Sequence, residues 1–262
     1  MKRRVIAFDL DNTLADSKSP LADQMADLLD RLLLRFQVCV ISGGTFEQFQ
    51  KQLLHGLKAA PDTLRALHVM PTCGTRYYRF DIATCSWQLV YAEDLTAAQK
   101  TKIVAALNSG ADALGYRASR LWGAQIEDRG SQITFSALGQ EAPIAEKEAW
   151  DPDGGKKRKL RDYVAKLIPD LGVRVGGSTS IDVTKHGIDK AYGIGKLIAL
   201  LDAAKQDVIF VGDRLSKGGN DYPVKAMGVD CLAVPDWRCG GPHRRRRRRL
   251  LRRQRRSRGR RA

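Results

Sequence analysis

The sequence has few cysteines and no long apolar run. Its five cysteines are scattered, odd in number and never spaced as Cys-x-x-Cys, so neither a disulfide framework nor a zinc site is expected. No apolar run approaches the roughly 18 residues that a membrane span needs. The first residues also turn acidic before the apolar region of a signal peptide could form. These absences predict a cytoplasmic protein with reduced, mostly buried thiols and no membrane partner.

Acidic residues are missing altogether from the last part of the chain. The 262 residues include 45 Lys plus Arg against 29 Asp plus Glu, a formal charge of +16. Residues 244–262 contain 13 arginines and no acidic residue, so residues 1–243 carry 32 basic and 29 acidic side chains, a charge of +3. The basicity therefore belongs to the tail, and the body of the protein is nearly neutral.

The arginine-rich tail, residues 244–262, is open to three interpretations. It can attract phosphate groups, but it has no interleaved aromatic residue and no base-reading element, so nucleic acid is expected only as a nonspecific partner. The same composition fits a disordered, solvated tail. The third hypothesis is a shifted reading frame of a GC-rich gene, which an intact mass of natively purified protein matching these residues would exclude.

Short apolar runs alternate with helical patterns in the first and last parts of the chain. Each apolar run is rich in strand formers and ends in a polar loop. The strands expected are 5–8, 38–41, 68–70, 208–211 and 231–234, and the helices between them are 21–34, 46–57 and 190–201. This alternation predicts an α/β fold with a Rossmann-like parallel-sheet core domain.

The middle of the chain interrupts the alternation. Residues 77–80 and 87–91 have the pattern of the two arms of a hairpin, and further antiparallel strands and helices are expected as far as residue 183. The pattern predicts an inserted α+β cap domain. The expected domains are the core, formed by residues 1–88 and 185–243, the cap, residues 89–184, and a disordered tail, residues 244–262.

Polar side chains follow three of the expected parallel strands. Asp9 and Asp11 come after the first, Ser42 after the second and Asp213 after the fourth. Ligands of open α/β sheets bind beyond the carboxyl ends of the strands, so these residues are expected to converge. The paired aspartates can face one cation, which phosphoryl transfer needs to offset phosphate charge. Taken alone, the aspartate turn could equally cap the next helix.

Four ordered segments resemble the motifs of the haloacid dehalogenase superfamily of phosphohydrolases and phosphomutases. They are Asp9-Leu10-Asp11-Asn12-Thr13, Ser42, Lys190, and Gly212-Asp213 with Gly219-Asn220-Asp221. The insertion between the second and third motifs is typical of the sugar-phosphatase group with a large α/β cap. Residues 176–183, 187–190 and 218–221 are most similar to the phosphomannomutase family. Such proteins normally close with an amphipathic helix, where this chain has its arginine-rich tail.

The resemblance implies a role for each core residue. Asp9 would be the nucleophile that forms an aspartyl phosphate, and Asp11 would be the general acid and base. Ser42 and the backbone at Gly43 would hold the phosphoryl oxygens, while Lys190 would balance charge and orient Asp9. The cofactor implied is Mg²⁺. Its ligands would be Asp9, the Asp11 carbonyl, Asp213, Asn220 and Asp221.

The cap would supply substrate selection. Arg129, Lys147, Ser180 and Asp182 fall where phosphomannomutases hold the distal phosphate and the sugar hydroxyls, although a plain surface location fits them equally well. Gln140 departs from the pattern, because the mutases have an arginine there. Losing a bidentate phosphate donor argues against binding of a bisphosphorylated sugar.

These residues predict a magnesium-dependent phosphatase, a phosphoric monoester hydrolase, that acts on a phosphorylated sugar or similar small metabolite through an aspartyl phosphate. The alternative is a phosphomannomutase that interconverts hexose 1- and 6-phosphates. A hypothesis of another class is a nucleic-acid-binding protein that works through its arginine tail. The resemblance also allows a homodimer formed through the cap.

Overall fold

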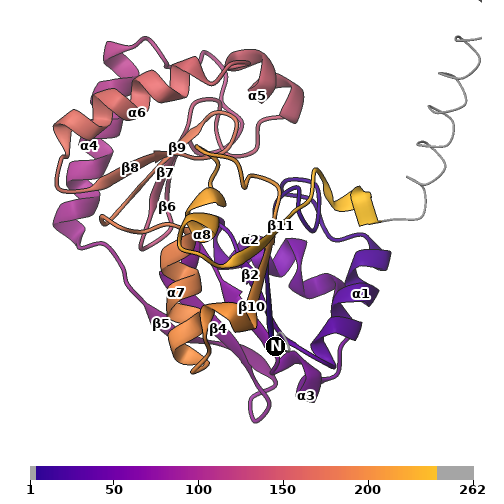
Figure 1. Cartoon of the computed structure of the whole chain (residues 1–262). Helices are drawn as coiled ribbons and strands as arrows, with labels where there is room; N and C mark the ends of the chain where they lie inside the picture. Colours follow the sequence, from indigo (N-terminus) through magenta and orange to yellow (C-terminus); the bar gives the residue numbers. More distant parts are fainter. Residues whose placement is uncertain (1–3, 241–262) are drawn as a thin grey trace, which may run out of the picture.

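The computed structural model of the chain describes residues 4–240. The hypotheses about residues 244–262 concern a segment outside this range. Figure 1 shows two lobes, a larger one that contains the N-terminal strand and a smaller one built from the middle of the chain.

The larger lobe is built on a seven-stranded sheet in the order β11-β10-β1-β2-β3-β4-β5. The five strands from β11 to β3 are parallel to their neighbours, and β4 and β5 are antiparallel. The strands are β1 Val5–Asp9, β2 Gln37–Ile41, β3 Leu67–Met70, β4 Arg76–Asp81, β5 Ser86–Ala92, β10 Val208–Gly212 and β11 Asp230–Ala233. The α/β class with a parallel-dominated core sheet is thereby confirmed.

Helices cover both faces of this sheet. One hydrophobic cluster packs α1 and α2 on one face, and a second packs α7 and α8 on the other. The helices are α1 Asp23–Leu33, α2 Phe46–Gln52, α3 Pro61–Leu64, α7 Lys190–Leu200 and α8 Tyr222–Ala226, with short 3-10 turns at Leu54–Gly56, Thr72–Gly74, Lys205–Asp207 and Trp237–Gly240. Helix α7 begins as expected, because the Asp189 carboxylate accepts a hydrogen bond from the Tyr192 backbone N–H at 3.0 Å.

The smaller lobe is a four-stranded antiparallel sheet covered by helices. The strand order is β6-β7-β9-β8, and α4 and α6 pack their apolar residues against it. The elements are α4 Ala97–Ala113, β6 Ile126–Asp128, β7 Ile133–Ser136, α5 Ile144–Trp150, α6 Gly155–Leu167, β8 Gly172–Val175 and β9 Ser180–Thr184. We call this lobe the cap, and the larger lobe the core.

The hairpin β4–β5 corrects the predicted boundary between core and cap. The boundary at residues 88 and 89 falls inside β5, which pairs with β4 from Ser86 to Ala92 as the edge of the core sheet. Apolar packing explains this placement, because Tyr77 of β4 belongs to the buried cluster of the core and Trp87 packs against the cluster on the other face. An alternating pattern identifies a hairpin but does not say which sheet it joins.

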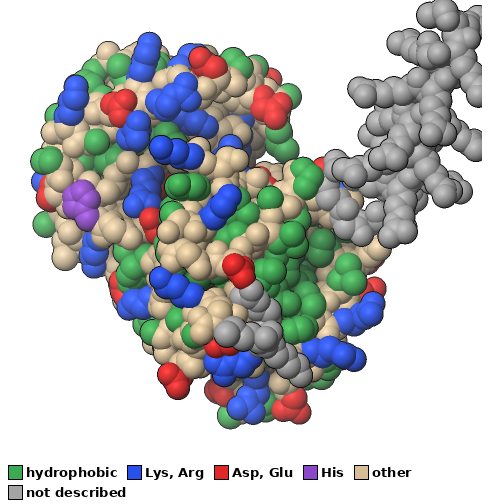
Figure 2. Space-filling model, viewed as in Figure 1, with side chains coloured by type: hydrophobic (Ala, Val, Ile, Leu, Met, Phe, Trp, Pro, Cys, Tyr) green, Lys and Arg blue, Asp and Glu red, His purple; other side chains and the backbone are tan. Residues whose placement is uncertain are grey.

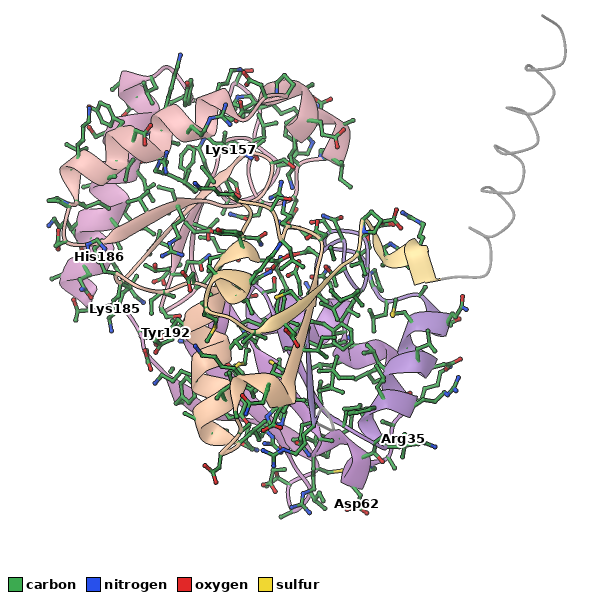
Figure 3. The ribbon with its side chains drawn as sticks, viewed as in Figure 1. Arg35, Asp62, Lys157, Lys185, His186 and Tyr192 are labelled. Carbon is green, nitrogen blue, oxygen red and sulfur yellow. The ribbon has the colours of Figure 1, made fainter. Side chains whose placement is uncertain are left out.

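Two short linkers join the core and the cap, and Glu93 ties them to α7. The Glu93 carboxylate accepts hydrogen bonds from the Tyr192 hydroxyl and from Lys196 Nζ, the second at 2.6 Å. Lys185 Nζ, in the second linker, lies 3.5 Å from the Glu93 backbone oxygen. Figure 3 shows Lys185 and Tyr192 on neighbouring parts of this junction. Both linkers are therefore anchored to the helix that carries Lys190.

An apolar groove of about 520 Å³ stays open beside α1 in the described part of the chain, lined by Phe8, Met25 and Leu32 among others. In Figure 2 hydrophobic side chains gather over this face of the core.

No helix between residues 4 and 240 is both long and apolar enough to cross a membrane. Cys39 is buried as expected, but Cys85 is exposed, so the prediction of mostly buried thiols is wrong at that position.

His68 is buried in the core, and none of its hydrogen-bond partners is a carboxylate. Its Nδ1 lies 2.8 Å from the Tyr77 hydroxyl and its Nε2 lies 2.8 Å from Gln37 Oε1. Arg79 also donates to Nδ1, at 3.2 Å. Burial, assisted by the Arg79 charge, lowers the pKa of His68 to about 3. The imidazole is therefore neutral in the folded protein at physiological pH.

This depressed pKa predicts that His68 makes the protein less stable in acid. The unfolded chain takes up a proton on His68 below its ordinary pKa of 6.5, whereas the folded chain does so only near 3. Stability is therefore complete above pH 6.5 and is lost between pH 6.5 and 3, with a slope of about 1.4 kcal/mol per pH unit. Urea unfolding from pH 7 to 4 should show a shallower slope for His68→Gln. The control is His186→Gln, at an exposed histidine, which should keep the slope of the unaltered protein. An unchanged slope in His68→Gln would contradict the expectation.

Candidate active site

The predicted site residues of the core meet at one edge of the parallel sheet. Asp9 is the last residue of β1, Ser42 follows β2, and Asp213 follows β10. These three strands are adjacent and parallel, so the loops after them lie side by side. Lys190, at the first position of α7, reaches the same place, where its side chain contacts Asp9 and Asp221.

Lys190 joins two buried aspartates at the centre of the site. Its Nζ lies 2.5 Å from Asp9 Oδ1 and 2.6 Å from Asp221 Oδ1. The three side chains are nearly excluded from solvent, with exposed fractions of 1% for Lys190, 4% for Asp9 and 0% for Asp221. A buried charge is tolerated only when it is paired and hydrogen-bonded. The arrangement therefore fixes the Asp9 carboxylate with one oxygen bound to Lys190.

The charges of these groups are strongly coupled. Burial raises the pKa of Asp9 to about 7, and Asp221 adds to this effect while Lys190 opposes it. Burial alone would lower the pKa of Lys190, but the charges of Asp9 and Asp221 outweigh burial and raise it above its usual value. Lys190 is therefore cationic over the physiological range, and it is the group that keeps ionised carboxylates in this buried place.

Three carboxylates form a group that fits a divalent cation. One oxygen each of Asp9, Asp213 and Asp221 lies within 4.8 Å of the other two. Oδ1 of Asp213 is buried and has no hydrogen-bond partner in the described part. Burial and the neighbouring Asp221 charge raise the pKa of Asp213. An unpartnered buried carboxylate oxygen among other carboxylates is a hard-ligand set of the kind that Mg²⁺ takes.

Local backbone geometry brings Asp221 to this group. A side chain on Gly212 would place its Cβ 2.4 Å from Asp221 Oδ2, so only glycine allows this approach. The same Oδ2 accepts a hydrogen bond from the Arg214 backbone N–H at 2.9 Å. Both oxygens of Asp221 are thus engaged, because Oδ1 is bound by Lys190. Asn220, by contrast, is exposed in the same loop.

Asp11 is held beside Asp9 by two donors on one of its oxygens. Asp11 Oδ1 accepts from the Lys18 backbone N–H at 2.9 Å and from Gln52 Nε2 at 3.3 Å. Gln52 is buried and also donates to the Ser19 backbone oxygen. Both contacts are made to Oδ1 rather than Oδ2, so they set the orientation of the carboxylate.

Ser42 and Gly43 lie where the cap touches the core. The buried Ser42 hydroxyl accepts a hydrogen bond from the Gly44 N–H at 3.3 Å. The Gly43 backbone oxygen accepts from Arg129 NH1 of the cap at 2.6 Å and lies 3.4 Å from Gln132 Nε2. The expected phosphate-binding loop is therefore in direct contact with the cap.

Cationic side chains from both lobes surround Gln140. Lys18 Nζ of the core donates to the Gln140 backbone oxygen at 2.5 Å, and Lys147 Nζ donates to the same oxygen at 3.2 Å. Arg129 NH2 lies 3.4 Å from Gln140 Oε1 and 2.6 Å from Glu127 Oε2. Burial, with the charges of Lys147 and Arg129, lowers the pKa of Lys18 to about 8. We call Lys18, Arg129 and Lys147 the cationic cluster.

Asp182 and Ser180 both lie on β9 of the cap, and each forms a hydrogen bond with a neighbouring segment. The Asp182 carboxylate accepts from the Thr134 hydroxyl at 2.7 Å. Burial raises its pKa, while Arg129 opposes this effect, so Asp182 lies near the cationic cluster. The Ser180 hydroxyl oxygen accepts from the Gly177 backbone N–H at 2.8 Å. Asp182 is thus close to the cationic cluster, whereas the Ser180 hydroxyl is bound to the loop that precedes β9.

Three residues of this site are not predicted by the sequence. The only signal for Lys18 is its position seven residues after Asp11, and Gln52 lies in an expected helix with nothing to indicate a role. Glu127 lies in the middle segment, where no motif marks it. Each gains a place in the site only through packing of segments distant in sequence, which a linear pattern does not show.

Comparisons with known proteins identify a family for this chain. A family model described as "Eukaryotic phosphomannomutase" matches residues 25–229. The chain is 29% identical over 233 residues to "Phosphomannomutase" of Babesia bovis, covering 86% of this chain and 89% of that protein. It is 26% identical over 240 residues to human "Phosphomannomutase 1", covering 86% and 84% respectively.

Solved structures with similar folds include a nucleotidase and a haloacid dehalogenase-like hydrolase. An IMP-bound, N-terminally truncated IMP-nucleotidase of Plasmodium falciparum aligns with a TM-score of 0.67 at 16% identity, over 90% of this chain and 66% of that one. A haloacid dehalogenase-like hydrolase of Bacteroides thetaiotaomicron aligns with a TM-score of 0.58 at 16% identity, over 85% of each chain. At these identities the likeness concerns the fold.

Proposed function

The chain belongs to the eukaryotic phosphomannomutase family, within the haloacid dehalogenase superfamily of phosphotransferases and phosphatases, and from that premise we propose that it interconverts hexose 1- and 6-phosphates. The sequence gives this activity as the alternative hypothesis, and the names of the relatives favour it over the sugar phosphatase. The proposal assigns the reaction centre to Asp9, Asp11, Ser42 and Lys190.

One observation carries the proposal, namely a second cationic site beside the reaction centre. Lys18 and Lys147 both donate to Gln140, and Lys147 is close enough to Asp11 for their charges to interact. A mutase must hold the second phosphate of a bisphosphorylated sugar while the first reacts, whereas a phosphatase needs only to admit water. Lys18 supplies, from the core, a positive charge that the neutral Gln140 does not supply from the cap.

The chemistry of the first step follows from the positions of the two aspartates. An Asp9 carboxylate oxygen attacks phosphorus and forms the aspartyl phosphate, while the bond from phosphorus to the sugar oxygen breaks. Asp11 gives its proton to that leaving oxygen. Lys190 holds Asp9 Oδ1 during the attack, and Ser42 with the Gly43–Gly44 backbone binds the phosphoryl oxygens. A bound Mg²⁺ would supply charge neutralisation, with Asp9, Asp213 and Asp221 as its carboxylates.

The second step reverses these roles on the free hydroxyl of a hexose monophosphate. Asp11 removes the proton from that hydroxyl, whose oxygen attacks the phosphorus of the aspartyl phosphate, and the Asp9 carboxylate is released. The phosphorylated enzyme thereby converts the monophosphate into a hexose 1,6-bisphosphate, whose other phosphate can then be transferred to Asp9 by the first step. The cationic cluster holds the phosphate that is not reacting. We assign hydrogen bonds with the sugar hydroxyls to Asp182, as an acceptor, and to the Ser180 hydroxyl, as a donor. A homodimer through the cap and a cytoplasmic location stay predictions of the sequence.

A sugar phosphatase is the second candidate, and a specific contact favours it. Arg129 is already occupied by Glu127 and by the Gly43 backbone oxygen, which leaves less of its charge for a distal phosphate. A panel of phosphosugars with Mg²⁺, followed for both isomerisation and free phosphate, separates the two candidates. We expect hexose phosphate interconversion stimulated by a hexose 1,6-bisphosphate. Free phosphate as the only product would decide for the phosphatase.

Removing the Lys18 charge should weaken binding of the bisphosphate. We expect Lys18→Met to raise the KM for hexose 1,6-bisphosphate about tenfold, the usual effect of losing a charge-assisted contact, with a smaller change in kcat. The backbone N–H of Lys18 that holds Asp11 remains in the variant. Lys51→Met, at an exposed lysine of α2, is the control. An unchanged KM in Lys18→Met would remove Lys18 from the proposed site.

Asp213 should be required for magnesium binding. Mg²⁺ bound only by the folded chain raises stability by RT ln(1 + [Mg²⁺]/Kd), so the melting temperature should rise with added Mg²⁺. We expect Asp213→Asn to lose most of that rise, because its buried oxygen lacks any other partner. Asp62→Asn, at the far end of the core in Figure 3, should keep it. An equal rise in the two variants would contradict the assignment of Asp213.

A further inference from the structure

A second hollow opens at the opposite end of the core, far from the aspartates. It has a volume of about 830 Å³ and lies between the ends of α1, α7 and the first residues of β1 and β2. Its polar lining consists of Arg4, Arg35, Gln37 and Arg79. Figure 3 shows Arg35 at the lower end of the core, on the side away from the cap.

The Arg79 guanidinium in the wall of this hollow is held only by uncharged groups. It donates to the Tyr77 hydroxyl at 3.0 Å, to His68 Nδ1 at 3.2 Å and to the Arg65 backbone oxygen. Its Nε is buried and has no hydrogen-bond partner within residues 4–240. A partly buried cation normally has a carboxylate beside it, because desolvation is otherwise uncompensated.

The hydrogen bonds around His68 point the Gln37 amide group toward the same hollow. Arg79 cannot accept a hydrogen bond, so the unprotonated nitrogen of His68 is Nδ1, to which Arg79 and Tyr77 donate. The proton therefore lies on Nε2 and is donated to Gln37 Oε1. With its oxygen engaged inward, Gln37 has its NH₂ group left to donate toward the hollow that it lines.

Positive charge exceeds negative charge around this hollow. Arg4 is paired with Asp207 at 3.1 Å, but within the described residues neither Arg35 nor Arg79 forms an ion pair with a carboxylate. Arg35 is also exposed, so its side chain can move to meet a ligand. The charged side chains that line the hollow are therefore all cationic, and apolar side chains such as Leu33, Phe36 and Leu201 complete the wall.

We propose that this hollow binds a small organic anion, with a phosphate or carboxylate group held by Arg35, Arg79 and Gln37 and an apolar body against Leu33, Phe36 and Leu201. Guanidinium groups match such oxyanions in geometry as well as in charge. The site is independent of the reaction centre, so the proposal does not depend on the function assigned above.

Phenylphosphonate is a suitable probe, because it combines the oxyanion with an apolar ring and is not hydrolysed as a phosphate ester. The full chain, labelled with ¹⁵N-arginine, would be titrated with it and the Nε–H resonances recorded. Burial of Arg79 Nε slows its exchange with water and keeps its resonance visible, and loss of the peak in Arg79→Lys identifies it. A local signal separates this hollow from binding at the reaction centre or elsewhere.

We expect the Arg79 resonance to shift saturably, with the Kd raised about tenfold in Arg35→Gln. Arg31→Gln removes an arginine one turn earlier on α1 that does not line this hollow, and its Kd should match that of the unaltered chain. Both substitutions replace exposed side chains, so we expect both variants to fold. No saturable shift at millimolar probe, or the same Kd in Arg35→Gln, would overturn the proposal. If inorganic phosphate bound as tightly as phenylphosphonate, the apolar side chains would not contribute to binding, and that part of the proposal would be overturned.

Discussion

Asp9→Asn should lower kcat by at least about a thousandfold, because the amide cannot replace the carboxylate as nucleophile. The same substitution should leave the protein at least as stable. Burial raises the pKa of Asp9 to about 7, so ionising it in the folded state costs free energy that the asparagine does not require. Lys190 keeps Asp221 as its partner in the variant. Kinetics on a hexose phosphate and thermal unfolding at pH 8 measure the two effects.

The joint outcome separates chemistry from folding. Asp27→Asn is the matched control, because Asp27 is exposed on α1 with only a long contact of 3.7 Å to Lys58. It should change neither kcat nor stability appreciably. Turnover by Asp9→Asn within tenfold of the unaltered enzyme, roughly 1.4 kcal/mol in activation free energy, would remove Asp9 from the chemical step.

The convergence of the core residues could be predicted from the sequence. Short apolar runs before Asp9, Ser42 and Asp213 indicated buried parallel strands, and parallel neighbours end at the same edge of the sheet. The position of Lys190 rested on the family resemblance alone, because a lysine at the start of a helix is usually exposed. In the structure its ammonium group is buried between two carboxylates.

Other features depend on packing that no local pattern contains. The β4–β5 hairpin was recognised as a hairpin, but Tyr77 packs in the core and places it on the core sheet. Lys18 and Gln140 are 122 residues apart and meet only because the cap lies over the aspartate loop. Gln140 therefore does not leave the proposed distal phosphate site without charge, because Lys18 brings a cation to it from the other lobe.

Both lobes contribute to the reaction centre through direct contacts in this arrangement. Arg129 of the cap donates to the Gly43 oxygen next to Ser42, and Lys18 of the core donates to Gln140 of the cap. Glu93 anchors the first linker to α7 through its ion pair with Lys196, which lies six residues after Lys190 on the same helix. A bisphosphorylated sugar that bridges the site around Lys190 and the cationic cluster would therefore stabilise this arrangement of the lobes.

Lys190→Met should have the largest effect on stability, a loss of about 3–5 kcal/mol, because it leaves ionised carboxylates buried without their cation. Asp9 and Asp221 lose their shared partner, and Asp213 stays nearby. Urea unfolding without added divalent cations measures the loss. Lys196→Met is the control, since its half-exposed pair with Glu93 should contribute no more than about 1 kcal/mol.

The pH dependence and a second substitution identify the cause of this loss. Lys190 opposes the rise in the pKa of Asp9, so without it that pKa in the folded state lies further above the unfolded value. Stability is then kept below about pH 4 and lost as pH rises. The deficit of Lys190→Met should therefore be smaller at pH 5 than at pH 8. Adding Asp221→Asn should recover part of the stability, because one unpaired charge is removed. A deficit that is independent of pH and not reduced by Asp221→Asn would mean that Lys190 acts through packing of its alkyl chain rather than through its charge.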